Sequence, residues 1–578
     1  MKIKQLMLAP VALGLAVPTA ATAATINMDA VNQYANQEQV TSINQFSDVR
    51  PSDWAYQALS NLIERYGCVA GYPDGTYKGG QSMTRYEAAA LLNACLDRIT
   101  EVTDELQRLL KEFQTELAVI RGRVDKLEAK VGQLEATQFS TTTKLSGQAT
   151  FVVGAVNAGG NSRSTSFDIS GKSDFNNKRN AADKYNARYG ATTFNYDLRL
   201  NFMTSFTGKD LLYTRLRSGN FSGAFGGNGS NLTFLDVASN GYGGLDCNGT
   251  RECSNSVGID RLYYTFPVGK EFTFTAGPIA RNTELLGANP SVYATNNSQK
   301  ILDFFATHGV PGTYNKATGA AVAAVWKQNV KPGQGRFSVS ASYVAPQGGI
   351  SQAYDGNPYE CSSNEGGVGT DCSRASFLTQ VAYTAPQWGL SAAYRYGQAG
   401  SNFRRGTNAI ADNSWWLKNG SSNSLAVNAY WQPLYSGWAP SVSVGWGINS
   451  LAGNRQNGVG DDYDLYPTQS QSWMVGLQWS DVIGKGNSLG IAAGQPTFGT
   501  SLARGTRNDL NTTPYDGNYA FEAWYAYRVS DNITITPSVF YLSRPLGEDT
   551  ITADSRGRYR YGDTFGVFGG LVQTTFRF

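Results

Sequence analysis

The sequence predicts a mainly β protein, a transmembrane antiparallel β-barrel preceded by a small helical domain and a coiled-coil helix. Three observations support this fold class. Apolar and polar residues alternate from about residue 139 to residue 578, whereas helical periodicity is confined to the first 137 residues. Charged residues are only 16%, against about 25% in a typical soluble domain. Aromatic residues reach 12% and there are 64 glycines, which suits a barrel with aromatic girdles and many turns.

Size and charge exclude several other classes. A chain of 578 residues is too long for one ordinary core, so at least two domains are expected. The net charge of +3, from 48 basic and 45 acidic residues, argues against a nucleic-acid partner. After the N-terminus no window supplies the run of apolar residues that a membrane-spanning helix needs.

The N-terminus has the pattern of an export signal. Two lysines precede an apolar stretch from Leu6 to Val17, and Ala21-Thr22-Ala23 fits a cleavage site. The alternative is a short buried helix. We expect residues 1–23 to be a signal peptide and residues 24–45 a linker, so that the mature chain leaves the cytosol.

Six cysteines form three pairs that are local in sequence. An even number in an exported protein favours disulfide bonds. Zinc is the alternative, but the spacings do not fit a zinc site and His308 is the only histidine. The expected disulfide bonds are Cys68–Cys95, Cys247–Cys253 and Cys361–Cys372. For the first pair the alternative is two free cysteines buried in the core of the domain. We expect no metal and no cofactor.

Residues 46–99 have a helical pattern interrupted by a turn. Trp54, Ala58 and Leu62 recur at helical spacing, and the motif "GYPDGTY" has turn residues in standard positions. Thr84 and Glu87 have the spacing of a capping box at the start of a second helix.

This segment resembles the S-layer homology domain over its whole length. The matching positions are Phe46, Asp48, Trp54, Gly71, Asp74, Gly75 and the run Thr84–Glu87. The resemblance implies binding of a cell-wall polymer linked to peptidoglycan, with Arg85 of the Thr-Arg-x-Glu motif meeting an anionic sugar. Thr84, Glu87, Asp48 and Trp54 are the further expected contacts, although Thr84 and Glu87 also fit a cap alone and Trp54 fits a core position. One repeat is present, whereas surface-layer proteins usually carry three.

Residues 100–137 predict one long helix with a narrow apolar stripe. Val102, Leu106 and Leu109 begin a series with steps of three and four that continues to Leu134. An extra step of four between Phe113 and Leu117 is a stutter. We expect a parallel coiled coil about 50 Å long at ~1.5 Å per residue. The alternative is a helix that lies on the following domain.

Residues 139–578 alternate with a period of two. In one example Phe337, Val339 and Tyr343 alternate with serines. The runs span roughly 8–11 residues and are bounded by Gly, Asn, Asp or Pro, as transmembrane strands are. The final strand, "TTFRF", must pair with the first because a closed barrel has no free edge. Its aromatic last residue resembles the recognition signal of bacterial outer-membrane barrels.

The three parts in this order resemble the outer-membrane porins of cyanobacteria, also described as iron uptake porins and related to the carbohydrate-selective porins. The most specific segments are "GYPDGTY", "MTRYEAAALLNACLDRI", "ITITPSVFYL" and "TTFRF". The resemblance implies about 16 strands, a homotrimer, and an outer-membrane location with the N-terminal domain in the periplasm. It also implies passive diffusion of small hydrophilic solutes and inorganic ions, iron among them. The alternative function is a structural tether between outer membrane and wall with a closed pore.

Four arginines lie on the parity opposite the apolar faces of their strands. Arginines facing lipid would cost about 2–4 kcal/mol near the membrane midplane, so this parity is expected to face the lumen. The expected pore-lining residues are Arg199, Arg215, Arg217 and Arg261. Such a set favours anions, unless Asp197 cancels it by pairing. The segment from Arg281 to about Lys331 is either an infolded constriction loop or an extracellular loop.

No residues suggest catalysis. His308 reads as a solvated loop residue, so a catalytic triad has no base. Asp461, Asp462 and Asp464 are loosely spaced for calcium and fit a plain acidic loop. We do not expect an enzyme.

Overall fold

The structure is a computed structural model of the chain. It describes residues 42–52, six isolated residues up to Lys111, and residues 142–578 with gaps at 222, 227–230, 240–254, 353–364, 402, 409, 411–419, 436, 454–465, 504–513 and 553–559. The chain divides into a unit of residues 1–138 and a unit of residues 139–578, and each is described separately. No helix among the described residues is both long and apolar enough to cross a membrane.

The second unit is a closed antiparallel barrel of sixteen strands in which each strand pairs with its neighbours in sequence. The strands are β1 (Thr143–Gly160), β2 (Thr193–Thr204), β3 (Leu211–Gly219), β4 (Gly258–Val268), β5 (Phe272–Arg281), β6 (Thr318–Lys327), β7 (Arg336–Ala345), β8 (Ser376–Thr384), β9 (Trp388–Gly397), β10 (Gly420–Trp431), β11 (Ser441–Gly453), β12 (Tyr466–Ser480), β13 (Ser488–Ala503), β14 (Tyr519–Arg528), β15 (Ile533–Ser543) and β16 (Phe565–Arg577). The predicted barrel and its strand number are confirmed.

The alternation in the sequence corresponds to the two faces of the wall. On β7, Phe337 and Val339 are exposed on the outside, whereas Ser338 and Ser340 are buried inside. Phe194 on β2 is 67% exposed although it is apolar, which is expected of a side chain that faces lipid. Several strands exceed the expected 8–11 residues, and β1 reaches 18.

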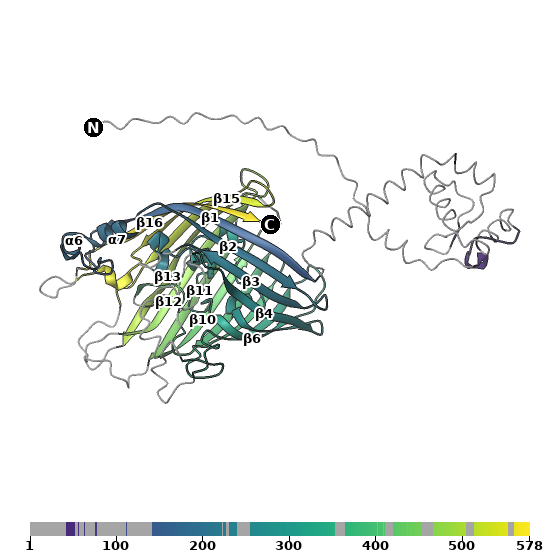
Figure 1. Cartoon of the computed structure of the whole chain (residues 1–578), viewed down its shortest axis with the longest axis horizontal. Helices are drawn as coiled ribbons and strands as arrows, with labels where there is room; N and C mark the ends of the chain where they lie inside the picture. Colours follow the sequence, from purple (N-terminus) through teal and green to yellow (C-terminus); the bar gives the residue numbers. More distant parts are fainter. Residues whose placement is uncertain are drawn as a thin grey trace. The chain divides into compact units, whose positions relative to one another are not determined.

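The barrel closes where β1 pairs with β16, from Gln148↔Arg577 to Gly160↔Phe565. Figure 1 shows this seam as the blue first strand beside the yellow last ones. The pairing continues through Gly147, whose N–H donates to the carbonyl of Phe578 at 2.6 Å. A Cβ at Gly147 would come within 2.1 Å of the Phe578 ring, so a larger residue here would have to displace the terminal ring. The predicted pairing of the last strand with the first is confirmed.

The two ends of the barrel differ. Short turns join the strands at the end where β1 begins and β16 finishes, whereas long connections join them at the other end. The long connections are 161–192, 220–257, 282–317, 346–375, 398–419, 454–465, 504–518 and 544–564.

Small helices lie in the long connections. They are α6 (Ser173–Lys178), α7 (Ala181–Tyr189), α8 (Asp303–Ala306), and the 3-10 turns η3 (Ala224–Gly226), η4 (Asn231–Thr233), η5 (Asn282–Glu284), η6 (Asn297–Gln299) and η8 (Gly547–Thr550). Helix α7 begins after Asn180, whose side chain accepts the N–H of Asp183. Asn186 then extends the ladder of β1 by bonding both the N–H and the carbonyl of Ala158.

Only a small part of the first unit is described. The 3-10 turn η1 (Ile43–Gln45) packs with buried Phe46 and Ile63. Asp48 accepts the N–H of Tyr77 at 2.6 Å, so this carboxylate fixes the end of the "GYPDGTY" turn. The other expected wall-binding residues, the pair Cys68 and Cys95, the signal peptide and the coiled coil apart from Lys111 lie outside the described residues.

Candidate pore constriction

The connection between β5 and β6, residues 282–317, folds into the barrel. Its hydrogen bonds reach the inner wall at Gln148 (β1), Gln380 (β8), Asn428 (β10), Ser443 (β11), Gln478 (β12), Ser488 (β13), Glu522 (β14), Thr536 (β15) and Gln573 (β16). The infolded alternative is therefore confirmed. The expected end near Lys331 is wrong, because residues 318–327 have a period of two and form β6. We call residues 282–317 the constriction loop.

A hydrogen-bonded contact on β14 holds the centre of the constriction loop. Glu522 accepts the hydroxyl of Tyr293 at 2.9 Å and the N–H of Leu302 at 2.9 Å. The indole N–H of Trp524 donates to the same Tyr293 hydroxyl. All of these side chains are buried, so each polar group obtains a partner in place of water.

The far end of the loop approaches the wall closely because two of its residues are glycines. A Cβ at Gly309, which has φ +72°, would lie 2.2 Å from Met474. A Cβ at Gly312 would lie 2.1 Å from the side-chain oxygen of Asn449. His308 contacts the ring of Tyr314 here and its carbonyl accepts from Asn428. His308 is a loop residue as expected, but it lies half-buried in the constriction loop beside the cavity rather than fully solvated.

Asp303, on α8, ties three long connections together. Its Oδ1 pairs with Lys316 at 2.5 Å, and its Oδ2 pairs with Arg404 and Arg405, both at 2.7 Å. Lys316 also reaches Asp236 from the β3–β4 connection. We call these five residues the charge lock. Burial alone would raise the pKa of Asp303, but the three cations hold it well below its usual range.

Strands β2 and β3 present arginines to the open side of the lumen. Arg199 and Arg217 are register partners, and each donates through Nε to a different oxygen of Asp197, at 2.6 and 2.5 Å. Two cations therefore share one buried carboxylate. The expected pairing of Asp197 with Arg199 is present, and the same carboxylate also pairs with Arg217.

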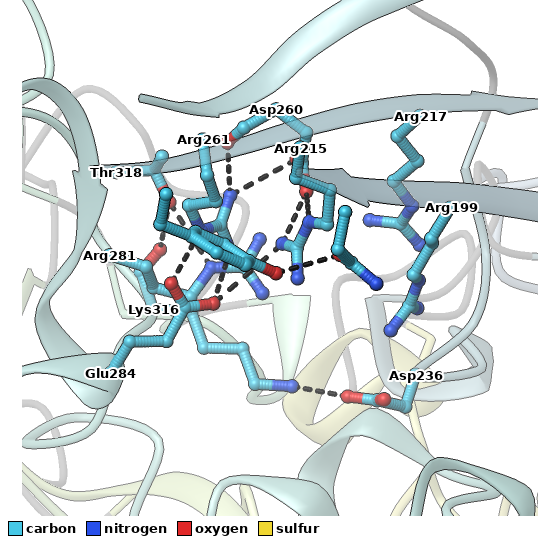
Figure 2. Close-up of polar contacts among 12 residues, drawn as sticks. Arg199, Arg215, Arg217, Asp236, Asp260, Arg261, Arg281, Glu284, Lys316 and Thr318 are labelled. Atoms are coloured by element: carbon cyan, nitrogen blue, oxygen red, sulfur yellow. Dashed lines mark hydrogen bonds and ion pairs between the residues drawn. The ribbon is translucent and has the colours of Figure 1, made fainter. Parts of the chain in front are cut away.

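A bulge on β4 places two consecutive residues inside the barrel. The register shifts between Arg215↔Arg261 and Leu216↔Ile259, which leaves Asp260 as the extra residue. Arg215 donates to Asp260 at 2.5 Å, and Arg261 binds Glu284 of the constriction loop with both Nε and Nη2. Figure 2 shows this network beside Arg199 and Arg217, with Lys316 reaching Asp236.

Two further cations have no carboxylate partner in the described part of the chain. Arg281, at the end of β5, donates through Nε to the hydroxyl of Thr318, and neither it nor Lys300 forms an ion pair with any described residue. Together with Arg199, Arg215, Arg217 and Lys316 they line a cavity of about 430 Å³ between the constriction loop and strands β2 to β6. Only two carboxylates, Asp236 and Glu284, are among its lining residues.

The constriction includes three of the four predicted pore residues. Arg199, Arg215 and Arg217 line the cavity, whereas Arg261 points inward but is fully buried beneath Glu284. Arg261 faces inward as expected, but Glu284 of the constriction loop covers its side chain, so a pore-lining role for Arg261 stays a prediction. Asp303, Asp236 and Arg281 were missed as functional residues, since nothing in the local sequence links them to partners up to 101 residues away.

The remaining sequence predictions fall partly outside the described residues. Cys372 is buried and disulfide-bonded, but its expected partner Cys361 is not described, nor are Cys247, Cys253 and the aspartates near residue 462. The three pairings stay predictions. Among the described residues no group of three or more His, Cys, Asp or Glu could hold a metal ion.

A closed sixteen-stranded barrel with a loop folded into its lumen defines an outer-membrane porin. Residues 101–578 match the carbohydrate-selective porin, OprB family, and residues 45–89 match the S-layer homology domain. The chain belongs to the OprB family of carbohydrate-selective porins and carries an N-terminal S-layer homology domain.

The similar proteins cover different parts of the chain. An uncharacterized protein of Nostoc sp. (strain PCC 7120) is 35% identical over 589 residues, covering 95% of this chain and 88% of the relative. Outer membrane protein SlpA of Deinococcus radiodurans is 36% identical over 110 residues, which is 17% of this chain and 9% of SlpA. The solved structure of Pseudomonas putida OprB at high pH aligns with a TM-score of 0.43 at 12% identity, covering 77% of this chain and 96% of that one.

Proposed function

We propose that the protein is a passive channel that admits small hydrophilic solutes and inorganic ions through the outer membrane and prefers anions. The observation that carries this proposal is the cavity left between the constriction loop and strands β2 to β6, whose lining has more cations than carboxylates. Fixed charges act strongly in a narrow, partly dehydrated passage, so they bias which ions enter. The same charge balance makes an anionic iron chelate a better cargo than the hydrated iron cation.

Planar-bilayer recording of the purified full-length protein tests the channel. We expect stepwise conductance, and in a salt gradient a reversal potential on the anion-selective side. Replacing Arg215 and Arg217 by Gln leaves Asp260 and Asp197 with less compensation and should shift the reversal potential toward cations. Lys485→Gln, in the exposed β12–β13 turn, is the matched control.

The two negative outcomes have different meanings. No stepwise conductance in the wild type would favour the second candidate function, a tether between outer membrane and wall with a closed pore. Conductance without a shift in the arginine variant would keep the channel and remove these two residues from its selectivity.

We further propose that the S-layer homology domain binds peptidoglycan-linked polymer through Arg85, with Thr84 and Glu87 beside it. Support comes from the Thr-Arg-x-Glu motif and from the family match over residues 45–89. A parallel three-stranded coiled coil over residues 100–137 would gather three such domains, and multivalency would raise the apparent affinity.

Co-sedimentation with purified peptidoglycan tests the wall attachment. Arg85→Ala should abolish pelleting while leaving conductance and oligomer mass unchanged, and Arg98→Ala in the same segment should pellet as the wild type does. Pelleting of the Arg85→Ala protein would contradict the assignment. Cross-linked mass before and after deletion of residues 100–137 tests the trimer.

A further inference from the structure

We infer that the constriction contains a saturable binding site for a small divalent oxyanion of the phosphate or sulfate class, formed by Arg199, Arg281 and Lys300. This inference rests on the proposed channel function and adds a ligand class to it. A channel that merely prefers anions needs only a positive field, whereas a binding site needs free hydrogen-bond donors that line the same cavity, as these three residues do.

Around the cavity, the described cations outnumber the carboxylates that pair with them, and the unpaired positive charge is confined to particular residues. Arg281 and Lys300 have no ion pair with any described residue, and Arg199 pairs with Asp197, a carboxylate that a second arginine also contacts. By contrast, Arg215 and Arg261 are balanced by Asp260 and Glu284. The surplus exceeds one unit, so a divalent anion neutralises more of it than chloride does.

The donors that face the cavity are free. Arg199 uses Nε for Asp197 and Arg281 uses Nε for Thr318, and no hydrogen bond joins their terminal nitrogens to another described residue. The ammonium of Lys300 likewise has no hydrogen bond to the described part of the chain. A guanidinium presents its nitrogens as a planar fork that matches two oxygens of one oxyanion, which a spherical halide cannot exploit.

These side chains start from fixed points of the fold. Arg199 and Arg281 are on strands of the closed wall. Lys300 follows η6, where Gln299 donates to Ser488 at 2.8 Å and the carbonyl of Asn297 accepts from Gln573. Because the loop backbone beside Lys300 is anchored to two strands, β13 and β16, less conformational entropy is lost when an anion binds.

The cavity suits a partly hydrated ion rather than a neutral sugar. Its volume of about 430 Å³ accommodates an oxyanion with several waters, at about 30 Å³ for each water. Tyr293 and the imidazole of His308 are the only aromatic rings among its described lining residues. Filling the cavity with a neutral sugar would displace water from cations without neutralising them, which is unfavourable.

Chloride current through the purified full-length protein in planar bilayers tests the site. Sodium sulfate, sodium phosphate or sodium nitrate is added at constant chloride and constant ionic strength. We expect sulfate and phosphate to reduce the chloride current saturably and nitrate, a monovalent oxyanion, to have little effect. In Arg281→Gln/Lys300→Gln the half-inhibitory sulfate concentration should rise by about tenfold or more, whereas Lys485→Gln should match the wild type.

Each outcome separates this inference from the channel itself. Anion-selective conductance without saturable inhibition by sulfate would overturn the site and leave the proposed function standing. If the wild type does not conduct, calorimetric titration of the detergent-solubilised protein with sulfate tests the site instead. The absence of a saturable heat of binding would overturn the site. The single variant Lys300→Gln replaces a half-buried loop lysine and serves if the double variant fails to fold.

Discussion

The two halves of the barrel wall use different polar groups on their inner faces. Strands β2 to β5 carry Arg199, Arg215, Arg217 and Arg281, which face the open cavity. Strands β10 to β16 offer serine, threonine, asparagine and glutamine to the constriction loop, and the carboxyl group of Glu522 also accepts loop hydrogen bonds. On β9, Arg395 is buried too, and its terminal nitrogens donate to the hydroxyls of Ser401 and Ser422.

This difference follows from what each half contacts. Neutral side chains can exchange water for a loop partner at small cost, whereas a charge in a dry contact needs an opposite charge. The arginine half meets this requirement with carboxylates, because Asp197, Asp260 and Glu284 pair with its arginines. A loop packed on one half therefore both narrows the lumen and determines which wall the solute meets.

The largest expected effect is the release of the constriction loop by Asp303→Asn. The substitution leaves Lys316, Arg404 and Arg405 without their shared carboxylate, and breaking a buried pair costs about 3–5 kcal/mol. We expect a larger single-channel conductance and faster proteolysis of residues 282–317, measured by bilayer recording and limited digestion.

Asp531→Asn is the control for this prediction. Its carboxylate pairs with Arg528 in an exposed turn, where an ion pair contributes little. An unchanged conductance in Asp303→Asn would show that contacts with the neutral wall hold the loop by themselves.

Tyr293→Phe tests the neutral half directly. The change removes the hydroxyl that donates to Glu522 and accepts from Trp524, and it should weaken loop docking by about 1–2 kcal/mol. Hydrogen exchange of the amides of residues 293–302 should accelerate, while the reversal potential stays anion-selective. Loss of the anion preference in this variant would mean that the two halves do not have separate roles.

A third prediction extends the comparison to the long connections beyond the neutral half. Asp516 is buried and accepts hydrogen bonds from Thr407, Gly499 and the N–H of Glu548. Burial raises its pKa from 3.8 to about 7, so the folded state favours the protonated form. This contribution to stability is complete below about pH 4, declines as the pH rises, and is lost above about pH 7.

Hydrogen exchange of the amides of residues 514–518, corrected for the intrinsic effect of pH on exchange, checks the predicted pH dependence of the Asp516 contribution. Protection should fall several-fold between about pH 5 and pH 8. The raised pKa of Glu548 acts in the same direction. Protection that is constant over this range would show that Asp516 does not change its ionisation.

The smallest expected effect comes from salt. The Debye length falls from about 10 Å at 0.1 M to about 3 Å at 1 M ionic strength, so the field of the arginine half should be partly screened. The anion preference should decline with salt, whereas proteolysis of the constriction loop should not change. A preference that is independent of salt would point to binding alone rather than to a long-range field.

The sequence predicted the regular parts of the molecule better than the irregular ones. Period-two patterns on strands such as β7 determine both the strand and its inner face, so the parity of Arg199 and Arg215 followed at once. The bulge at Asp260 breaks that parity, and no local pattern marks it. The direction of the constriction loop also had no local signal, because polar loop residues suit water and a polar lumen equally. The charge lock joins residues from three connections and depends on the folded barrel.

The seam between β1 and β16 has a consequence for how the chain reaches this structure. Thr150 and Thr575 meet there although they are 425 residues apart. Bringing together two strands that are 425 residues apart costs more chain entropy than pairing strands adjacent in sequence, so we expect an interval during refolding in which neighbouring strands have paired but the seam is still open. During that interval the edge of β1, with Phe151 and Val153 on its apolar face, is a template for pairing with any other extended chain. We therefore expect the yield of refolding to fall steeply with protein concentration, because an intermolecular encounter competes with the slow arrival of the chain's own partner strand.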